Sequence, residues 1–130
     1  MPISTYAGNL VLDWLLSTDA ATRPTAWYLS LHTVDPGLTG ANEVVVGTDA
    51  DYVRKAMTFA AAATLAKASN ASATWTADAA ATTYVVTHIG IWDAATAGNF
   101  LAGGQLAVAE TVVASGTLNL ASGRAIAAIS

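Results

Sequence analysis

The sequence predicts a mainly β protein: an antiparallel β-sandwich with jelly-roll-like connections, preceded by one N-terminal amphipathic α-helix. Short segments rich in β-branched and aromatic residues follow one another at a spacing of about ten residues, separated by turn-forming residues. One segment near the N-terminus instead has apolar residues at helical spacing. The 130 residues are enough for one domain. We divide it into a helix and connector at 1–24 and a sandwich at 25–130.

The helix is expected over Thr5–Leu16. Its apolar residues recur at intervals of three and four positions and so share one face: Tyr6, Leu10, Val11, Trp14 and Leu15. Asn9 and Asp13 lie on the opposite face, and Ser4 is placed to cap the first turn. The polar residues that follow, up to Pro24, form a connector.

Strand patterns begin after this connector. Apolar and polar residues alternate over Trp27–His32, which predicts a half-buried strand. Asp35–Gly37 then forms a turn, because proline lacks an N–H donor and glycine accepts positive φ. We expect a long loop over Leu38–Ala50, with a brief edge strand at Val44–Val46. Alternation resumes over Tyr52–Phe59, which predicts a second strand.

The second half of the chain predicts the rest of the sandwich. Ala60–Ala68 has helix-forming composition, but we expect an irregular crossing into a short strand around Thr74–Thr76. Thr82–Trp92 is nearly continuous β-former and predicts the central strand, with Gly90 as a bulge or a point of close approach. The remaining strands are expected between turns: Phe100–Leu106 with a break at Gly103–Gly104, Thr111–Val113, Thr117–Leu120 and Arg124–Ile129.

The composition narrows the classes of partner and location that this protein could have. Apolar residues make up 54% and charged residues 11% of the chain, and the net charge is −4. Five scattered basic residues cannot neutralise a row of phosphates, so we expect no nucleic-acid partner. No apolar run is long enough to span a bilayer, and no basic segment precedes an apolar one as in a secretory signal. The weakly charged exterior predicts that neighbouring copies or partners cover part of it.

Few residues here suggest chemistry, and we assign no catalytic, cofactor-binding or metal-ligating residue. His32 and His88 lie in strand patterns, and we expect hydrogen-bonded histidines at a sheet surface or interface. Asp49 and Asp51 have the spacing of a calcium loop, but no glutamate closes the loop. Because Arg54–Lys55 follows, a solvated turn with local salt bridges is the favoured interpretation.

Turn chemistry and core packing account for other conspicuous residues. Asp93 is expected to close the hairpin over Asp93–Asn99. Trp27 and Trp92 are expected in the core. A carbohydrate-binding adhesin stays an alternative and would need exposed aromatic rings, for which Trp75 is the test residue. A small enzyme would need a pocket in which a histidine meets a carboxylate.

Two long blocks of sequence resemble a family of small tailed-bacteriophage virion proteins, often labelled tail fibre or minor tail proteins. The first block is Trp27–Pro36, followed by Thr39–Val44 and Tyr52–Arg54. The second block is Val86–Thr96, followed by Gly98–Leu101 and Gly104–Leu106; the opening helix over Tyr6–Leu16 is also similar. Gly47–Asp51 departs from the family's usual glycine pair.

The resemblance implies a non-enzymatic structural component of a phage virion, made in the bacterial cytoplasm. A chain of this length without a shaft repeat is a poor match for a fibre shaft. We therefore expect a capsid decoration or cement protein on the head exterior, bound to the major capsid protein or neighbouring subunits as a homotrimer. A tail fibre, minor tail or head fibre component is the alternative. The candidate interface residues are Tyr6, Leu10, Trp14, Leu38, Val44 and Val45.

Overall fold

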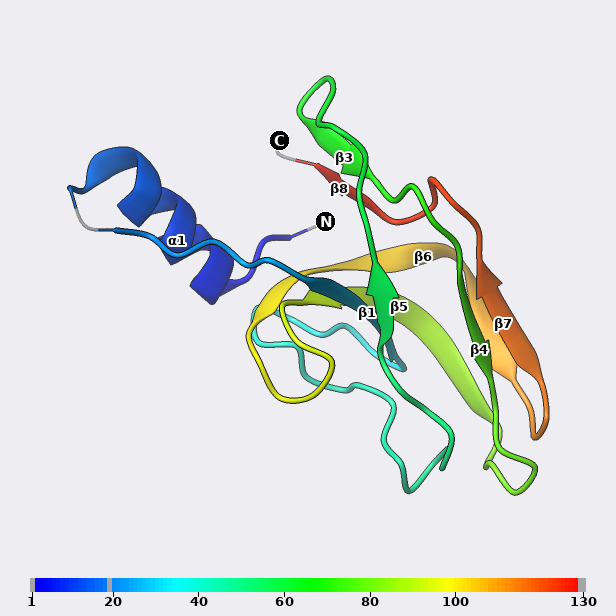
Figure 1. Cartoon of the computed structure of the whole chain (residues 1–130). Helices are drawn as coiled ribbons and strands as arrows, with labels where there is room; N and C mark the ends of the chain where they lie inside the picture. Colours follow the sequence, from blue (N-terminus) through cyan, green and yellow to red (C-terminus); the bar gives the residue numbers. More distant parts are fainter. Residues whose placement is uncertain (1, 19, 129–130) are drawn as a thin grey trace.

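The computed structural model of the chain describes residues 2–18 and 20–128. Its elements are α1 (Thr5–Leu16), β1 (Trp27–His32), β2 (Lys55–Met57), β3 (Ala66–Ala68), β4 (Ala73–Thr76), β5 (Tyr84–Trp92), β6 (Phe100–Val112), β7 (Thr117–Leu120) and β8 (Ile126–Ala128). The predicted fold class is confirmed, because the strands pair antiparallel and one helix precedes them (Figure 1).

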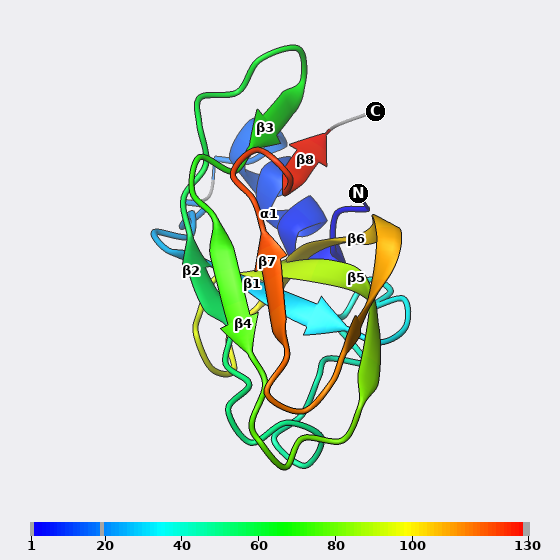
Figure 2. The same cartoon turned by 90° about the vertical axis from the view of Figure 1, so that its right-hand side faces the viewer.

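The strands form one large sheet and two small pairs. The large sheet has the order β2-β1-β5-β6, and the pairs are β3-β8 and β4-β7. The β4-β7 pair lies across one face of the large sheet and forms the second layer of the sandwich (Figure 2). The β3-β8 pair lies at the upper end of the molecule in Figure 1, beyond the large sheet.

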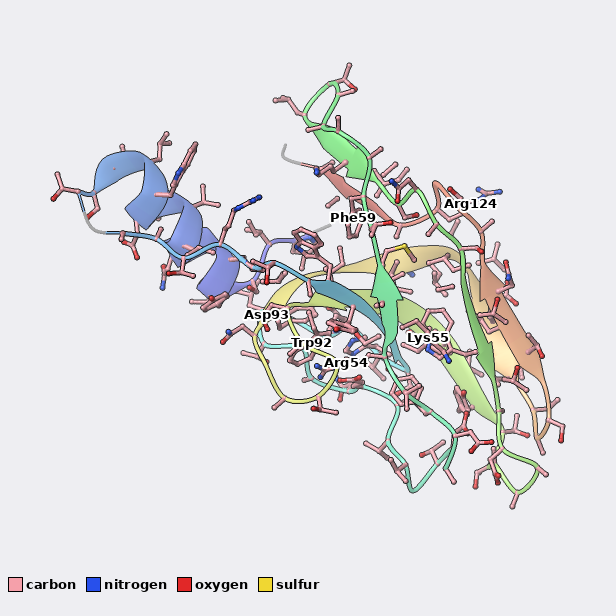
Figure 3. All side chains as sticks on the ribbon, in the orientation of Figure 1. Arg54, Lys55, Phe59, Trp92, Asp93 and Arg124 are labelled. Atoms are coloured by element: carbon pink, nitrogen blue, oxygen red, sulfur yellow. The ribbon has the colours of Figure 1, made fainter. Side chains whose placement is uncertain are left out.

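Several strands are shorter than the sequence predicts. The second strand is reduced to β2, and Phe59 beyond it forms only an isolated bridge to Ser69 (Figure 3). The expected edge strand over Val44–Val46 is wrong: Glu43 makes a single bridge to His32, and the chain then turns. The expected strand over Arg124–Ile129 is present only as β8, and Ile129 lies outside the described residues.

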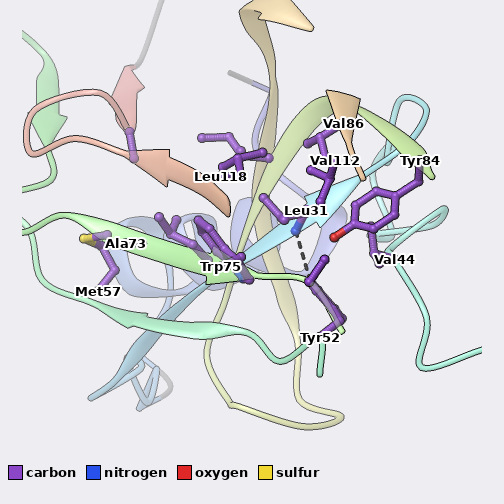
Figure 4. Packing of buried hydrophobic residues seen from close by; sticks show 14 of the residues in the cluster. Leu31, Val44, Tyr52, Met57, Ala73, Trp75, Tyr84, Val86, Val112 and Leu118 are labelled. Atoms are coloured by element: carbon purple, nitrogen blue, oxygen red, sulfur yellow. Dashed lines mark hydrogen bonds between the residues drawn. The ribbon is translucent and has the colours of Figure 1, made fainter. Parts of the chain in front are cut away.

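The core lies between the two layers (Figure 4). Leu31 and Val86 of the large sheet are fully buried and face Trp75 and Leu118 of the β4-β7 pair. The Tyr52 hydroxyl reaches into this layer and accepts a hydrogen bond from the Leu31 N–H at 3.0 Å. Burial of these large side chains is the main stabilising contribution of the sandwich.

β1 is buried on both faces, not on one as its alternation predicts. Ser30 and His32, the polar positions of the pattern, are 0% exposed. The loop after β1 covers them, and Phe100 lies edge-on to the His32 ring at 6.1 Å between centroids. The polar side chains are tolerated there because each makes a hydrogen bond.

Glycines allow this close covering. A Cβ at Gly90 would lie 2.5 Å from the Ser30 hydroxyl and 2.8 Å from Phe100, so Gly90 is a point of close approach. The register shifts of β5 against β6 lie on either side of it, between Val86 and His88 and between Ile91 and Trp92. The expected break at Gly103–Gly104 is wrong, because β6 runs through it. Gly103 keeps its place in the strand and leaves room for Phe100.

Candidate functional site: an exposed apolar helix

α1 begins where the N-terminal segment is bonded to the edge of β6. The Ser4 N–H donates to the Leu101 carbonyl at 2.8 Å, and the Ser4 hydroxyl donates to the Phe100 carbonyl. The same hydroxyl oxygen accepts from the Ala7 N–H at 3.0 Å, which confirms the predicted cap. Within α1, all of whose residues are described, burial is limited to Ala7. Ser4 therefore both starts the helix and attaches it to the sandwich.

Beyond this attachment the helix projects from the sandwich (Figure 1) and leaves large apolar side chains in solvent. Trp14 is 72% exposed. Four more residues are between 47% and 77% exposed: Val11, Leu12, Leu15 and Leu16. Single exposed apolar residues are ordinary on a protein surface, whereas a contiguous patch of them marks an interaction site.

Four of the six predicted interface residues fall into two places on this surface. Leu10 and Trp14 line a shallow groove between α1 and the connector that follows it. Tyr6 and Leu38 line a second depression, where the start of α1 meets the loop after β1 and the β5-β6 hairpin. Both depressions therefore border the helix.

The remaining two predicted interface residues point in opposite directions. Val45 is 58% exposed, whereas Val44 is 4% exposed and its N–H donates to the Leu31 carbonyl at 2.9 Å. Including Val44 in the interface is therefore wrong. Successive residues of an extended segment face opposite sides. The Val44 side chain therefore points into the core, and the Val45 side chain points into solvent.

Comparison with known protein families identifies the family of this chain. Over residues 2–127 the sequence matches the family model described as podophage GP4 fiber I protein gp80. The chain belongs to this family. The resemblance to tailed-phage virion proteins is confirmed, and this fiber I family member is a structural virion component. No curated protein sequence matches it.

The two histidines of this fiber I family member are structural. They are paired across β1 and β5. His32 Nε2 lies 2.7 Å from the Ser30 hydroxyl and its Nδ1 lies 2.7 Å from the Ala41 carbonyl, and burial lowers the pKa of His32. His88 Nδ1 lies 2.8 Å from the Thr87 hydroxyl. The expected hydrogen bonding is confirmed, but His32 lies in the interior and not at a surface.

The acidic turn is also structural, and its expected exposure is right for Asp51 but wrong for Asp49. Asp49 is 2% exposed. Its Oδ1 accepts from the N–H groups of Asp51 at 3.1 Å and Asp78 at 2.9 Å, and its Oδ2 accepts from the Tyr84 hydroxyl at 2.8 Å. Burial, and then this hydrogen bond, raises the pKa of Tyr84. In the described part of the chain no three acidic or histidine side chains gather as a metal site.

Sequence reasoning missed the ion pair that fixes the loops beside α1. Arg54 bonds Glu43 with two nitrogens, Nε at 2.9 Å and Nη2 at 2.7 Å. Its Nη1 donates to the carbonyls of Ala94 at 3.1 Å and Ala97 at 2.7 Å, and its guanidinium lies 3.6 Å from the centre of the Trp92 ring (Figure 3). The signal was available, since Arg54, Glu43 and Trp92 all fall in the blocks that resemble the phage family.

The burial of Trp75 and the hydrogen bonds of Asp93 decide two further expectations. Trp75 is 2% exposed and its Nε1 donates to the Val53 carbonyl at 2.9 Å, so Trp75 is not part of an exposed aromatic surface. Asp93 closes the β5-β6 hairpin as predicted, because its Oδ1 accepts from the Asn99 N–H at 2.6 Å.

Across residues 2–18 and 20–128, no helix has the length and apolar character to cross a membrane.

Proposed function

We propose that the chain is a subunit of a virion fibre mounted on the head or the tail, and that α1 holds it in the assembly. The observation that carries the first part is the family match over residues 2–127. The exposed apolar side chains of α1 support the second part. The partners are neighbouring virion subunits, and no enzymatic role is proposed.

The energetics favour a contact that is repeated many times. Burying a large apolar side chain contributes about 1.5–3 kcal/mol, and α1 offers Trp14 and several such residues. Association itself costs about 4–15 kcal/mol. One helix contact is therefore weak alone, and equivalent contacts in a symmetric particle add through avidity.

A capsid decoration protein is the second candidate. The low charge of 11% charged residues suits a subunit packed on the shell beside the major capsid protein. The description of the matched family as a fibre protein favours the fibre over this candidate, which the sequence alone had placed first.

Labelling and deletion together test the proposal. Gold-labelled antibody on intact particles is expected to mark discrete fibres, and particles lacking the gene are expected to lose those fibres while keeping their resistance to heat and low salt. Label spread evenly over the shell, together with fragile deletion particles, would reject the fibre and favour the decoration protein.

A further inference from the structure

We propose that His32 is an acid-sensitive switch: when its ring takes up a second proton, the loop formed by residues 33–43 opens from the large sheet while the rest of the sandwich stays folded. We call these residues the covering loop. The switch is a property of the fold and does not depend on where the chain lies in the virion. Three features carry it: the enclosure of the ring, its hydrogen bonds and the charges around it.

The ring of His32 is enclosed on every side by protein. It is 0% exposed on β1, and Phe100 lies edge-on to it with 6.1 Å between the ring centroids. β5 lies so close that a Cβ at Gly90 would be 2.6 Å from His32 Nε2. Because β1 is paired with β2 on one side and β5 on the other, the covering loop is the element that can lift to admit water.

The hydrogen bonds around the ring fix the position of its proton. Trp92 Nε1 donates to the Ser30 hydroxyl at 2.9 Å. That hydroxyl lies 2.7 Å from His32 Nε2, and His32 Nδ1 lies 2.7 Å from the Ala41 carbonyl. A carbonyl only accepts, so the neutral ring carries its proton on Nδ1. Nε2 is then an acceptor, and the Ser30 hydroxyl donates to it.

A second proton does not fit this arrangement. In the charged ring both nitrogens donate, so Nε2–H would point at the Ser30 oxygen, which already accepts from Trp92. The Ser30 proton would lose the acceptor that it has in the neutral state, and Ser30 is 0% exposed. A buried donor without an acceptor and a buried charge in apolar surroundings are both unfavourable. Water reaches both groups when the covering loop opens.

The charged groups around the ring do not compensate its protonation. Burial has the largest effect and lowers the pKa of His32. The Ala41 carbonyl and the Glu43 carboxylate raise this pKa, whereas Arg54 and His88 lower it. Both oxygens of Glu43 bond Arg54, so that negative charge is already balanced. His88 is paired with His32 from β5, and β6 contributes an uncharged aromatic ring. The closed loop therefore favours the neutral form.

The covering loop is held to the sheet near its tip by Pro36 and Ala41. Pro36 is fully buried, and a Cβ at Gly103 would lie 2.6 Å from it. The Ala41 carbonyl is bonded to His32. Further bonds of the tip are internal, since the Pro36 carbonyl accepts from the Gly40 and Ala41 N–H groups, both at 3.0 Å. The loop can therefore lift and keep these internal bonds.

Proton linkage gives the expected size of the effect. In the open loop the ring is in water and has the ordinary histidine pKa of 6.5, whereas the closed loop keeps it neutral. Closure is therefore fully favoured above pH 6.5 and progressively less favoured below it. We expect the equilibrium constant for opening to rise by up to about thirtyfold between about pH 8 and about pH 5.

Nitrogen NMR of the histidine ring tests the hydrogen-bond assignment in the unmodified chain. At about pH 8 we expect His32 to carry its proton on Nδ1 and none on Nε2, because Nδ1 faces the Ala41 carbonyl. A proton on Nε2 would overturn the proposal, since the ring would then have a different set of partners.

Hydrogen exchange of two buried indole groups tests the opening. Trp92 Nε1–H donates to Ser30 beside the ring and reports on the covering loop, whereas Trp75 Nε1–H donates to the Val53 carbonyl and reports on the whole sandwich. After correction for the intrinsic effect of pH, we expect Trp92 to exchange faster than Trp75 at both pH values. Its rate should rise by up to about thirtyfold from about pH 8 to about pH 5. Equal exchange of the two groups, or a Trp92 rate that acid leaves unchanged, would overturn the switch.

Two variants assign the acid response to one histidine. His32→Asn keeps a donor for Ala41 but takes up no proton, so the acid effect on Trp92 is expected to disappear. His88→Asn, on the paired strand, is the matched control and is expected to keep the effect. The opposite result in either variant would overturn the proposal. Thermal unfolding at about pH 8 checks that each variant folds; the ring proton and the two indoles of the parent chain decide the question even where His32→Asn does not.

Discussion

Arg54 joins three segments that are far apart in the sequence, and removing it tests the packing beside α1. Its bonds reach Glu43 in the loop after β1 and the carbonyls of Ala94 and Ala97 in the β5-β6 hairpin. The side chains of the ion pair are only 9% and 19% exposed. Replacing Arg54 by alanine therefore leaves the Glu43 carboxylate largely buried without its cation.

The expected cost is large compared with the stability of a small domain. Removing one partner of a buried ion pair typically costs about 3–5 kcal/mol, and the contact with the Trp92 ring contributes about 0.5–2 kcal/mol. Because these contributions are not additive, we expect Arg54→Ala to lower the free energy of unfolding by about 3–5 kcal/mol. Arg54→Lys keeps the charge but loses the two-nitrogen contact, so we expect it to lie between alanine and the parent.

Urea unfolding followed by tryptophan fluorescence measures these changes. Glu43→Gln, alone and combined with Arg54→Ala, completes a double-mutant cycle that isolates the pair. A loss below about 1 kcal/mol for Arg54→Ala, the value of a surface salt bridge, would refute the reasoning. So would a lysine variant as stable as the parent.

Other predictions concern the interior of the large sheet. Gly90→Ala places a Cβ 2.5 Å from the Ser30 hydroxyl, so we expect urea unfolding to show a loss of about 1–3 kcal/mol; full stability would contradict the close approach. Because burial lowers the pKa of His32 below its ordinary 6.5, the unfolded chain takes up the proton first, and stability should fall as pH falls below 6.5. His88→Asn should keep this slope and His32→Asn should lose it. Burial raises the pKa of Tyr84 above its ordinary 10.0, so stability should fall as pH rises above 10, less steeply in Tyr84→Phe.

The sequence predicts elements well where the signal is local. The bounds of α1 are as predicted, since helical spacing and the Ser4 cap both lie within a few residues of the helix. β7 likewise coincides with its expected range over Thr117–Leu120. β3 was missed inside Ala60–Ala68, because its alanines have helix-forming composition and its partner β8 lies far along the chain.

The candidate site was likewise predictable only where its sequence signal is local. Periodicity placed Tyr6, Leu10 and Trp14 on one apolar face, but only the structure shows that most of that face is exposed beyond the sandwich. The contact of Arg54 with Glu43 depends on how distant loops meet, which alternation and turn residues do not encode. The covering of β1 by the loop that follows it is also long-range, and it buries Ser30 and His32, the face that alternation predicts to be exposed.

A reconstruction of the intact particle at side-chain resolution tests most directly whether α1 is an assembly element. We expect density for the chain in a fibre, with Trp14 buried against a neighbouring virion subunit. Density in which the helix stands free in solvent, its tryptophan touching no other subunit, would contradict the account.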